Sequence, residues 1–186
     1  AGAEGLYFRL RLVGGLGCVA CSAWSEPYRR RRLLSFRNPF SMMSDEGYQL
    51  SQSLIAFGSG GIFGMGLGMG RQKYAYLPYP ESDFIFAIVG EDFGLLGCLI
   101  VVALFVALML RGMRIAMRCP DKFGTLLAAG ITSSISVQAF LNMGVVVGIL
   151  PTTGLPLPFF SAGGTSISIT MAAIGILPNI SRESAI

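Results

Sequence analysis

The sequence predicts an all-α polytopic membrane protein, on the evidence of its composition, its long apolar stretches and the charges between them. Of its 186 residues, 53% are hydrophobic and only 13% are charged, whereas soluble domains carry about a quarter charged residues. The 25 glycines lie among Leu, Ile, Val and Phe, as in membrane bundles, where small residues let helices approach closely. No nucleic-acid partner is expected of such a chain.

Four stretches are expected to enter or cross a membrane: a shortened helix over 6–24 and full helices over 84–110, 123–150 and 166–180. A span needs roughly 20 residues. The second and third stretches meet this length, and the fourth needs part of the loop before it. Arg9 and Arg11 interrupt the first stretch and leave an uncharged core that is too short to span unless the arginines extend to an interface.

The orientation follows from the basic residues of one short connection. The connection 111–122 joins the two strongest stretches and carries three arginines and one lysine against Asp121, which is typical of a cytoplasmic loop. By alternation we expect extracytoplasmic loops over 25–83 and 151–165 and a cytoplasmic tail over 181–186. The whole chain is expected to form a single membrane domain.

The long outer loop has two unusual parts. A basic run lies at Arg29–Arg32; either it is tolerated because long loops escape the charge rule, or its guanidinium groups bind lipid headgroups or a pyrophosphate. Further along, Gly60, Gly64 and Gly68 are spaced four residues apart in an apolar segment. Such spacing allows close backbone packing and favours a half-buried, re-entrant or interfacial segment.

The side chains available for chemistry are limited, because the chain contains no histidine. Acid–base catalysis would therefore fall to Asp, Glu, Lys, Tyr or Cys. Cys18 and Cys21 form a CxxC without a second pair, and Cys98 and Cys119 stand alone. We expect no zinc site and four unpaired cysteines.

Five stretches, in this order, are the most specific features of the chain: SEPYRRRRLLSFRNP, GYQLSQSLIAFGSGGIFGMGLGMGRQK, YLPYPESDFIFAIVGEDFGLLG, LNMGVVVGILPTTGLPLPFFSAGGTS and ILPNISR. Together they resemble the SEDS family of cell-wall glycan polymerases, and GLGMGRQKYAYLP resembles its division branch, FtsW, more than the RodA branch. The resemblance implies the C-terminal part of a ten-helix fold: a shortened seventh helix, a large outer loop and the last three helices.

The resemblance also implies a function. Family members are peptidoglycan glycosyltransferases that polymerise lipid II during division, with undecaprenyl pyrophosphate as the leaving group. The alternatives are a lipid II flippase and a non-catalytic divisome scaffold that recruits a transpeptidase. A piece of this length is expected to be inactive alone.

The same resemblance supplies partners and a location. A class B penicillin-binding transpeptidase, other divisome membrane proteins and membrane lipids are the expected partners, in the bacterial inner membrane. No cofactor is expected with certainty. A divalent cation remains an alternative because some members depend on one, although no cluster of carboxylates in the sequence places it.

The catalytic residue implied by the family is Asp83, as general base. The neighbourhood departs from the family pattern: YLPYPESDF stands where YLPEAHTDF is usual, which introduces Tyr79 and Glu81, and FSAGGT stands where ISYGGS is usual, which introduces Ala162. The substrate-binding candidates are Arg29, Arg30, Arg32, Lys73, Glu81, Glu91, Ser161, Gly163 and Gly164.

Several of these features have a structural alternative. The structural alternative for Asp83 is an N-cap carboxylate of the following helix. On a helix of period 3.6, the small side chains of Ala87, Gly90, Gly94 and Val101 fall near the same face as Asp83 and would leave room for a substrate or for another helix. Glu91 and Asp92 are intramembrane carboxylates, a class that is functional by default. They would otherwise lie at an interface and reach headgroups or water, and Glu91 could pair with an outer-loop arginine.

Polar residues in the next stretch and loop are open to two interpretations. Gly130, Ser134, Gln138 and Asn142 recur every four residues and would either join helices or contact substrate. The loop that follows contains a Gly pair next to Thr165. It would either donate hydrogen bonds to a sugar or phosphate or cap the last helix.

Overall fold

The computed structural model describes residues 46–70, 83–160 and 163–183. The predicted helix over 6–24, the arginine run, Lys73, Tyr79, Glu81, Ser161 and Ala162 lie outside these residues. The chain divides into two compact units, Ala1–Tyr48 and Gln49–Ile186. The fold described below is that of the second unit.

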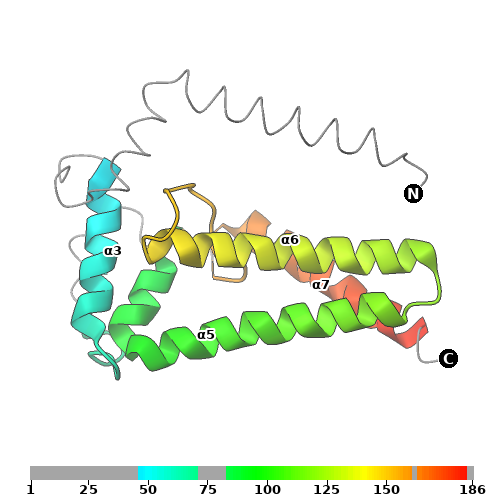
Figure 1. Cartoon of the computed structure of the whole chain (residues 1–186), viewed down its shortest axis with the longest axis horizontal. Helices are drawn as coiled ribbons and strands as arrows, with labels where there is room; N and C mark the ends of the chain where they lie inside the picture. Colours follow the sequence, from blue (N-terminus) through cyan, green and yellow to red (C-terminus); the bar gives the residue numbers. More distant parts are fainter. Residues whose placement is uncertain (1–45, 71–82, 161–162, 184–186) are drawn as a thin grey trace, which may run out of the picture. The chain divides into compact units, whose positions relative to one another are not determined.

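The described part of the chain consists of helices joined by turns and loops, and it contains no strand. Its elements are α3 (Glu46–Gly60), α5 (Ile85–Arg118), α6 (Lys122–Val146) and α7 (Gly164–Glu183), shown in Figure 1. Three helices are long and apolar enough to cross a membrane: Ile85–Arg118, Lys122–Val146 and Gly164–Arg182. The predicted all-α membrane fold with three full spans is therefore confirmed.

Helix α3 was not foreseen, because the whole outer segment was predicted as a loop. Its inner face carries Leu50, Ser53 and Ala56, which are buried, and this i, i+3, i+6 spacing is that of one helix face. The Ser53 hydroxyl donates a 2.6 Å hydrogen bond to the carbonyl oxygen of Val146, at the end of α6. The helix ends at Gly60, since Gly61 adopts the left-handed conformation with φ 57°.

The turn between α5 and α6 is shorter than predicted. Helix α5 continues to Arg118, so most of the basic connection is helical, and Asp121 is the N-cap of α6. The Asp121 carboxylate accepts a 3.0 Å hydrogen bond from the amide of Gly124, which satisfies one of the orphan donors at the start of α6. The basic side chains Arg111, Arg114 and Arg118 are exposed, as a connection in water requires.

Helix α6 ends four residues before the predicted boundary at 150. Gly148 has φ 78°; its amide bonds the carbonyl of Val145, and the amide of Ile149 bonds that of Gly144. This pattern is a Schellman motif, in which a glycine beyond the C-cap closes the last turn. The helix therefore stops where glycine permits the reversal, although the apolar sequence continues.

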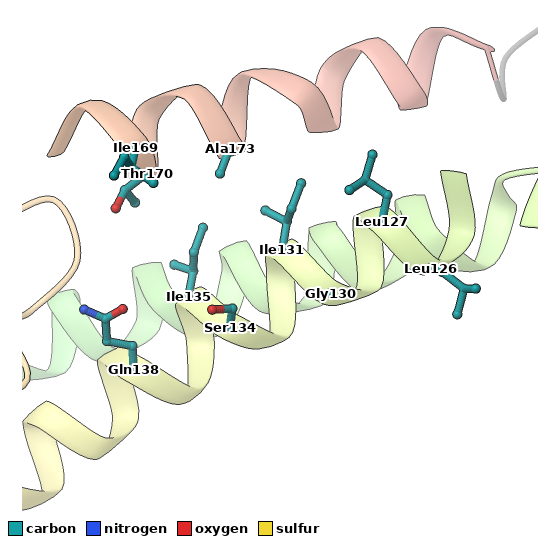
Figure 2. Close-up of a pocket in the computed structure, with 10 residues that line it drawn as sticks. All are labelled: Leu126, Leu127, Gly130, Ile131, Ser134, Ile135, Gln138, Ile169, Thr170 and Ala173. Carbon is teal, nitrogen blue, oxygen red and sulfur yellow. The ribbon is translucent and has the colours of Figure 1, made fainter. Parts of the chain in front are cut away.

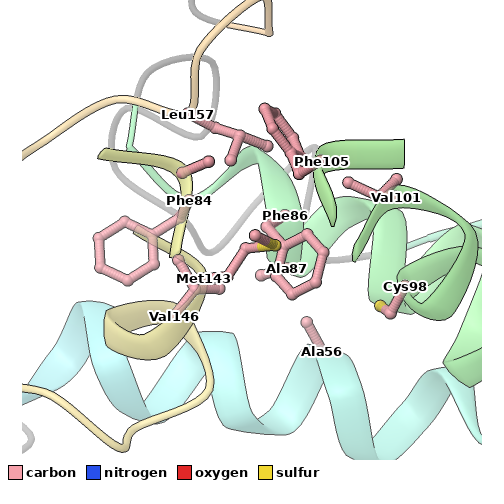
Figure 3. Packing of buried hydrophobic residues seen from close by; sticks show 11 residues of the cluster. Ala56, Phe84, Phe86, Ala87, Cys98, Val101, Phe105, Met143, Val146 and Leu157 are labelled. Carbon is pink, nitrogen blue, oxygen red and sulfur yellow. The ribbon is translucent and has the colours of Figure 1, made fainter. Parts of the chain in front are cut away.

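The main core joins α3, α5, α6 and the loop after α6, as Figure 3 shows for its buried side chains. Its larger members include Phe86, Phe105, Met143 and Leu157, all at most 6% exposed. A second cluster at the other end of the helices joins Ala116, Ala128, Leu177 and Ile180. The first cluster positions the residues considered next.

Candidate functional site

Asp83 lies at the start of α5 and is partly exposed. The N-cap position is Phe84, which makes no side-chain cap hydrogen bond, so the alternative interpretation of Asp83 as the N-cap residue is wrong. The backbone of Asp83 is instead bonded by a side chain of α6. The buried Asn142 side chain donates a 2.8 Å hydrogen bond to the carbonyl oxygen of Asp83 and a 2.7 Å hydrogen bond to that of Leu155.

The loop after α6 borders the Asp83 carboxylate. A Cβ placed on Gly154, which has φ 68°, would lie 3.6 Å from Asp83 Oδ2. The loop is held by Gln138, whose amide donates a 2.9 Å hydrogen bond to the carbonyl oxygen of Pro156. Phe159 has φ 70°, a strained conformation for a bulky residue, and its ring lies 6.2 Å from that of Phe105. The side chains of α6 and α5 thus hold the loop beside Asp83.

The polar stripe of α6 therefore has two parts. Gln138 and Asn142 donate to carbonyls of the loop after α6, and Asn142 also donates to the carbonyl of Asp83 just before α5. The interpretation that the stripe joins helices is therefore supported for Asn142, whereas Gln138 holds the loop. Gly130 and Ser134 are exposed and line, with Gln138, a cavity of about 440 Å³ between α6 and α7. Figure 2 shows that Ile169, Thr170 and Ala173 of α7 complete its lining.

The row of small residues after Asp83 does not leave an open groove. Ala87, Gly90 and Gly94 are all buried, and a Cβ on Gly90 would collide with the ring of Phe57 on α3. The expectation of room for another helix is therefore correct for Gly90, and the expectation of room for a substrate is wrong there. The alignment with Asp83 was also wrong, because Asp83 precedes the helix and α5 is broken at Gly94.

The break in α5 is the main irregularity of the fold. Gly94 has φ 66° and ψ −160°, values that only glycine adopts without strain. Around the break, a glycine loop (residues 61–70) takes over the hydrogen bonds that the helix gives up. The amides of Met65 and Gly66 donate to the carbonyls of Glu91 and Asp92, and the amides of Leu95 and Leu96 donate to those of Gly61 and Ile62.

Glycine is required on both sides of this junction. A Cβ on Gly64 would collide with the backbone of Asp92, and a Cβ on Gly94 would lie 2.6 Å from the carbonyl oxygen of Ile62. Gly60 is equally close to the backbone of Gly90. The predicted close packing is therefore confirmed for Gly60 and Gly64, whose partner is the broken segment of α5, and is wrong for Gly68, where a Cβ would meet nothing within 4 Å.

Glu91 and Asp92 are buried, with 1% and 7% of their surfaces exposed. They converge on the end of the glycine loop: a Cβ on Gly70 would lie 2.7 Å from Glu91 Oε2 and 2.9 Å from Asp92 Oδ1. Within the described residues Asp92 Oδ1 has no hydrogen-bond partner, while Asp92 Oδ2 is 3.5 Å from the amide of Gly68. The alternative that these carboxylates lie at an interface and reach headgroups or water is wrong, because they are buried against the end of the glycine loop.

Gly163 and Gly164 lie at the start of α7, and both are exposed. The amide of Ile167 donates a 3.1 Å hydrogen bond to the carbonyl of Gly163, which supports the interpretation that this pair begins the helix. Among the described residues there is no group of three or more His, Cys, Asp or Glu side chains that could hold a metal ion.

Two residues beside Asp83 escaped the sequence-based selection of site residues. Asn142 was recognised only as part of a polar stripe, and its signal was an amide within an otherwise apolar stretch. Gly154 gave no signal beyond its place between prolines, because its proximity to Asp83 depends on how the loop folds back.

Comparison with known proteins gives the family. The profile of the FtsW/RodA/SpoVE cell cycle proteins matches residues 1–186. A probable peptidoglycan glycosyltransferase FtsW from Geobacter metallireducens is 51% identical over 156 residues, which cover 84% of this chain and 42% of that protein. Stage V sporulation protein E from Bacillus subtilis is 47% identical over 175 residues, which cover 94% and 48%.

Two solved structures are also similar. A structure described as showing the coordination of polymerization and crosslinking by a peptidoglycan synthase complex matches with a TM-score of 0.71 and 27% identity, over 97% of this chain and 51% of that one. The rod shape determining protein RodA of Thermus thermophilus matches with a TM-score of 0.54 and 30% identity, over 71% and 40%. The chain spans about half the length of the relatives it matches. It belongs to the FtsW/RodA/SpoVE family of cell cycle proteins.

Proposed function

We propose that this chain is the catalytic part of a peptidoglycan glycosyltransferase that polymerises lipid II during cell division in the bacterial inner membrane. The observation that carries the proposal is the setting of Asp83. Its carboxylate is partly exposed at the start of a membrane span, its backbone is tied to α6 by Asn142, and a stiffened loop borders it at Gly154. A fixed carboxylate with access to solvent is what a general base needs.

The reaction follows from that role. A sugar hydroxyl of one lipid II molecule attacks the anomeric carbon of another, and Asp83 takes the hydroxyl proton. The new glycosidic C–O bond forms as the bond from the anomeric carbon to the pyrophosphate breaks, and undecaprenyl pyrophosphate leaves. Rigid placement of the base relative to the two sugars contributes to the rate, because it removes part of the entropic barrier.

The position of Asp83 along α5 supports this role. The unbroken part of α5 after Gly94, residues 95–118, extends about 36 Å at ~1.5 Å per residue, which is enough to cross the roughly 30 Å hydrocarbon core of a bilayer. The exposed arginines at its C-terminal end favour the cytoplasmic side for that end. Asp83, at the opposite end, would then lie at the outer surface, where the sugars of lipid II would be.

The relatives support the reaction class and a partner. Two of the similar proteins carry the names peptidoglycan glycosyltransferase FtsW and peptidoglycan synthase complex. By extension we propose lipid II as substrate and a class B penicillin-binding transpeptidase as partner, together with other divisome proteins. Of the proposed substrate contacts, Arg29, Arg30, Arg32, Lys73, Glu81 and Ser161 remain predictions.

The contacts of the polar side chains favour a polymerase over a flippase. A flippase would use a polar path through the bilayer, for which Glu91, Gln138 and Asn142 were the candidates. The amides of Gln138 and Asn142 are engaged with backbone carbonyls, and Glu91 is buried against Gly70. The contacts of the two amides therefore favour structural roles for Gln138 and Asn142, and the burial of Glu91 does not favour an open polar path.

The test uses a full-length chimera in which this chain replaces the matching 48% of the Bacillus subtilis relative. With labelled lipid II, we expect Asp83→Asn to reduce glycan polymer about 100-fold or more, the lower end of what a positioned base contributes. Folding and binding of the transpeptidase should survive. Asp121→Asn is the matched control, since that aspartate caps α6 at the other end of the helices, and it should retain polymerisation.

The remaining outcomes separate the alternatives. Full polymerisation by Asp83→Asn would exclude this carboxylate as the base. Movement of the lipid II headgroup across vesicles without polymer would indicate a flippase, and binding of the transpeptidase with neither activity would indicate a scaffold.

A further inference from the structure

The glycine loop has two chemically different sides. Its glycines alternate with large apolar residues, and Gly64, Gly66 and Gly68 all have positive φ. Gly64 lies against the broken segment of α5. The apolar side chains between the glycines are exposed: Phe63 by 81%, Met65 by 44%, Leu67 by 77% and Met69 by 72%. Ile62 is also 60% exposed.

An exposed cluster of five large apolar side chains is unusual in contact with water. The loop also carries no charged residue from 61 to 70. Because charged side chains are the ordinary means of keeping an outer loop in water, their absence favours an apolar environment around this one.

The backbone of the loop is prepared for such an environment. Hydrogen bonds occupy the amides of Gly64, Met65, Gly66 and Met69 and the carbonyls of Gly61, Ile62 and Gly66. Irregular backbone at membrane depth is tolerated only where its polar groups are satisfied within the protein. The break in α5 takes part in four of these bonds, so the two irregular segments satisfy part of each other's backbone.

The apolar surface of the loop continues onto a membrane span. The loop is bonded to Leu95 and Leu96, where the uncharged part of α5 begins, and both side chains are about half exposed. Leu99, Ile100 and Leu104 extend this exposed apolar surface along the helix. The loop therefore lies at the depth at which the lipid-exposed part of α5 starts.

We propose that the glycine loop is a re-entrant element inserted into the bilayer, with Phe63, Met65, Leu67 and Met69 in contact with the hydrocarbon of bulk membrane lipid. The occupant is the bilayer itself, because the contact surface is continuous with a span and carries no group that would select a headgroup. This proposal concerns how the protein sits in the membrane and does not depend on the catalytic role of Asp83.

Spin labelling tests the proposal in the full-length chimera, with its other cysteines removed, in vesicles that contain no lipid II. Nitroxide labels at Phe63→Cys and Leu67→Cys are compared for collision with oxygen, which concentrates in lipid, and with a water-soluble nickel complex. We expect severalfold greater access to oxygen than to nickel at both positions. The opposite ratio is expected for a label at Lys122→Cys, which lies exposed at the polar turn between α5 and α6.

Either other result would overturn the proposal. Greater access to nickel would place the loop in water, and low access to both reagents would show that protein covers it. Since the vesicles lack lipid II, a lipid signal cannot come from the polyprenyl chain of a substrate. Met65→Cys, at a less exposed position of the same loop, provides a second variant if either of the first two fails to fold.

Discussion

The junction between α5 and the glycine loop differs sharply from the contact between α6 and α7. At the junction, backbone lies on backbone, four backbone hydrogen bonds cross between the two segments, and Gly60, Gly64 and Gly94 leave no room for a methyl group. Between α6 and α7 there is a cavity of about 440 Å³. Only 11% of the residues in the most apolar stretch of α7 are buried. One contact is completed within this chain, and the other leaves much of its surface to lipid or to further protein.

The difference has a physical cause. A broken helix exposes amides and carbonyls that lipid cannot satisfy, so the chain that contains the break must also contain the segment that repairs it. A regular helix such as α7 satisfies its own backbone, and lipid can cover its side chains at little cost. Irregular elements are therefore expected to show strict residue requirements, and regular ones to tolerate change.

The largest effect is expected at the junction. Gly64→Ala combines a positive φ with a collision against the backbone of Asp92, and we expect it to reduce the free energy of unfolding by more than about 2 kcal/mol. The measurement is thermal unfolding of the full-length chimera in detergent. Gly58→Ala is the matched control on α3: its Cβ would meet nothing within 4 Å, so it should stabilise the protein by about 0.5–1 kcal/mol. Equal unfolding temperatures for the two variants would contradict the account of the junction.

An intermediate effect is expected at Asn142. Asn142→Leu keeps the shape of the side chain but removes both hydrogen bonds, to the part-buried carbonyls of Asp83 and Leu155, at a cost of about 1–3 kcal/mol for the two. Polymerisation should fall as well, because the backbone of Asp83 is no longer fixed. Gln138→Leu removes a single hydrogen bond, to Pro156. It should therefore reduce the free energy of unfolding and the polymerisation less than Asn142→Leu does. If Gln138→Leu proved the more damaging for polymerisation, Asn142 would not be the residue that positions Asp83.

The smallest effect is expected between α6 and α7. Ala173→Leu adds apolar atoms that point into the cavity (Figure 2). It should raise the free energy of unfolding by about 1 kcal/mol, since a buried methylene group contributes about 0.8 kcal/mol. Met171→Leu, at an exposed position of the same helix, is the control and should be neutral. Destabilisation by Ala173→Leu would show that other side chains fill this space in the full-length protein, and that α7 is as closely packed as the junction.

Much of the fold was predictable because membrane spans depend on local composition. The apolar stretches around Leu104 and Ile135, and the arginines between them, predicted two spans and a polar turn without knowledge of any contact. The ends were less well predicted. Asp121 and Gly148 decide where α6 begins and ends, and their capping interactions count for more than the apolar pattern that continues past Gly148.

The candidate site was predicted in part. The sequence proposed Asp83 as a site residue through a family resemblance, and it singled out Gln138 and Asn142 through their spacing. Neither the spacing nor the resemblance indicated that Asn142 binds the backbone of Asp83, because the two residues are 59 positions apart. The predicted face of small residues failed for a related reason: a periodicity of 3.6 assumes an unbroken helix, and Gly94 ends that regularity.

The sequence alone determined the class of the protein, its three spans and the residues capable of acid–base chemistry, since these depend on composition and local pattern. Only the tertiary structure decided how the glycine loop is used. Whether a glycine serves as a hinge, a spacer or a contact depends on which backbone approaches it. In this protein that backbone is the broken segment of α5. Its amides and carbonyls bond a loop that can approach closely, because glycine stands at the positions in contact.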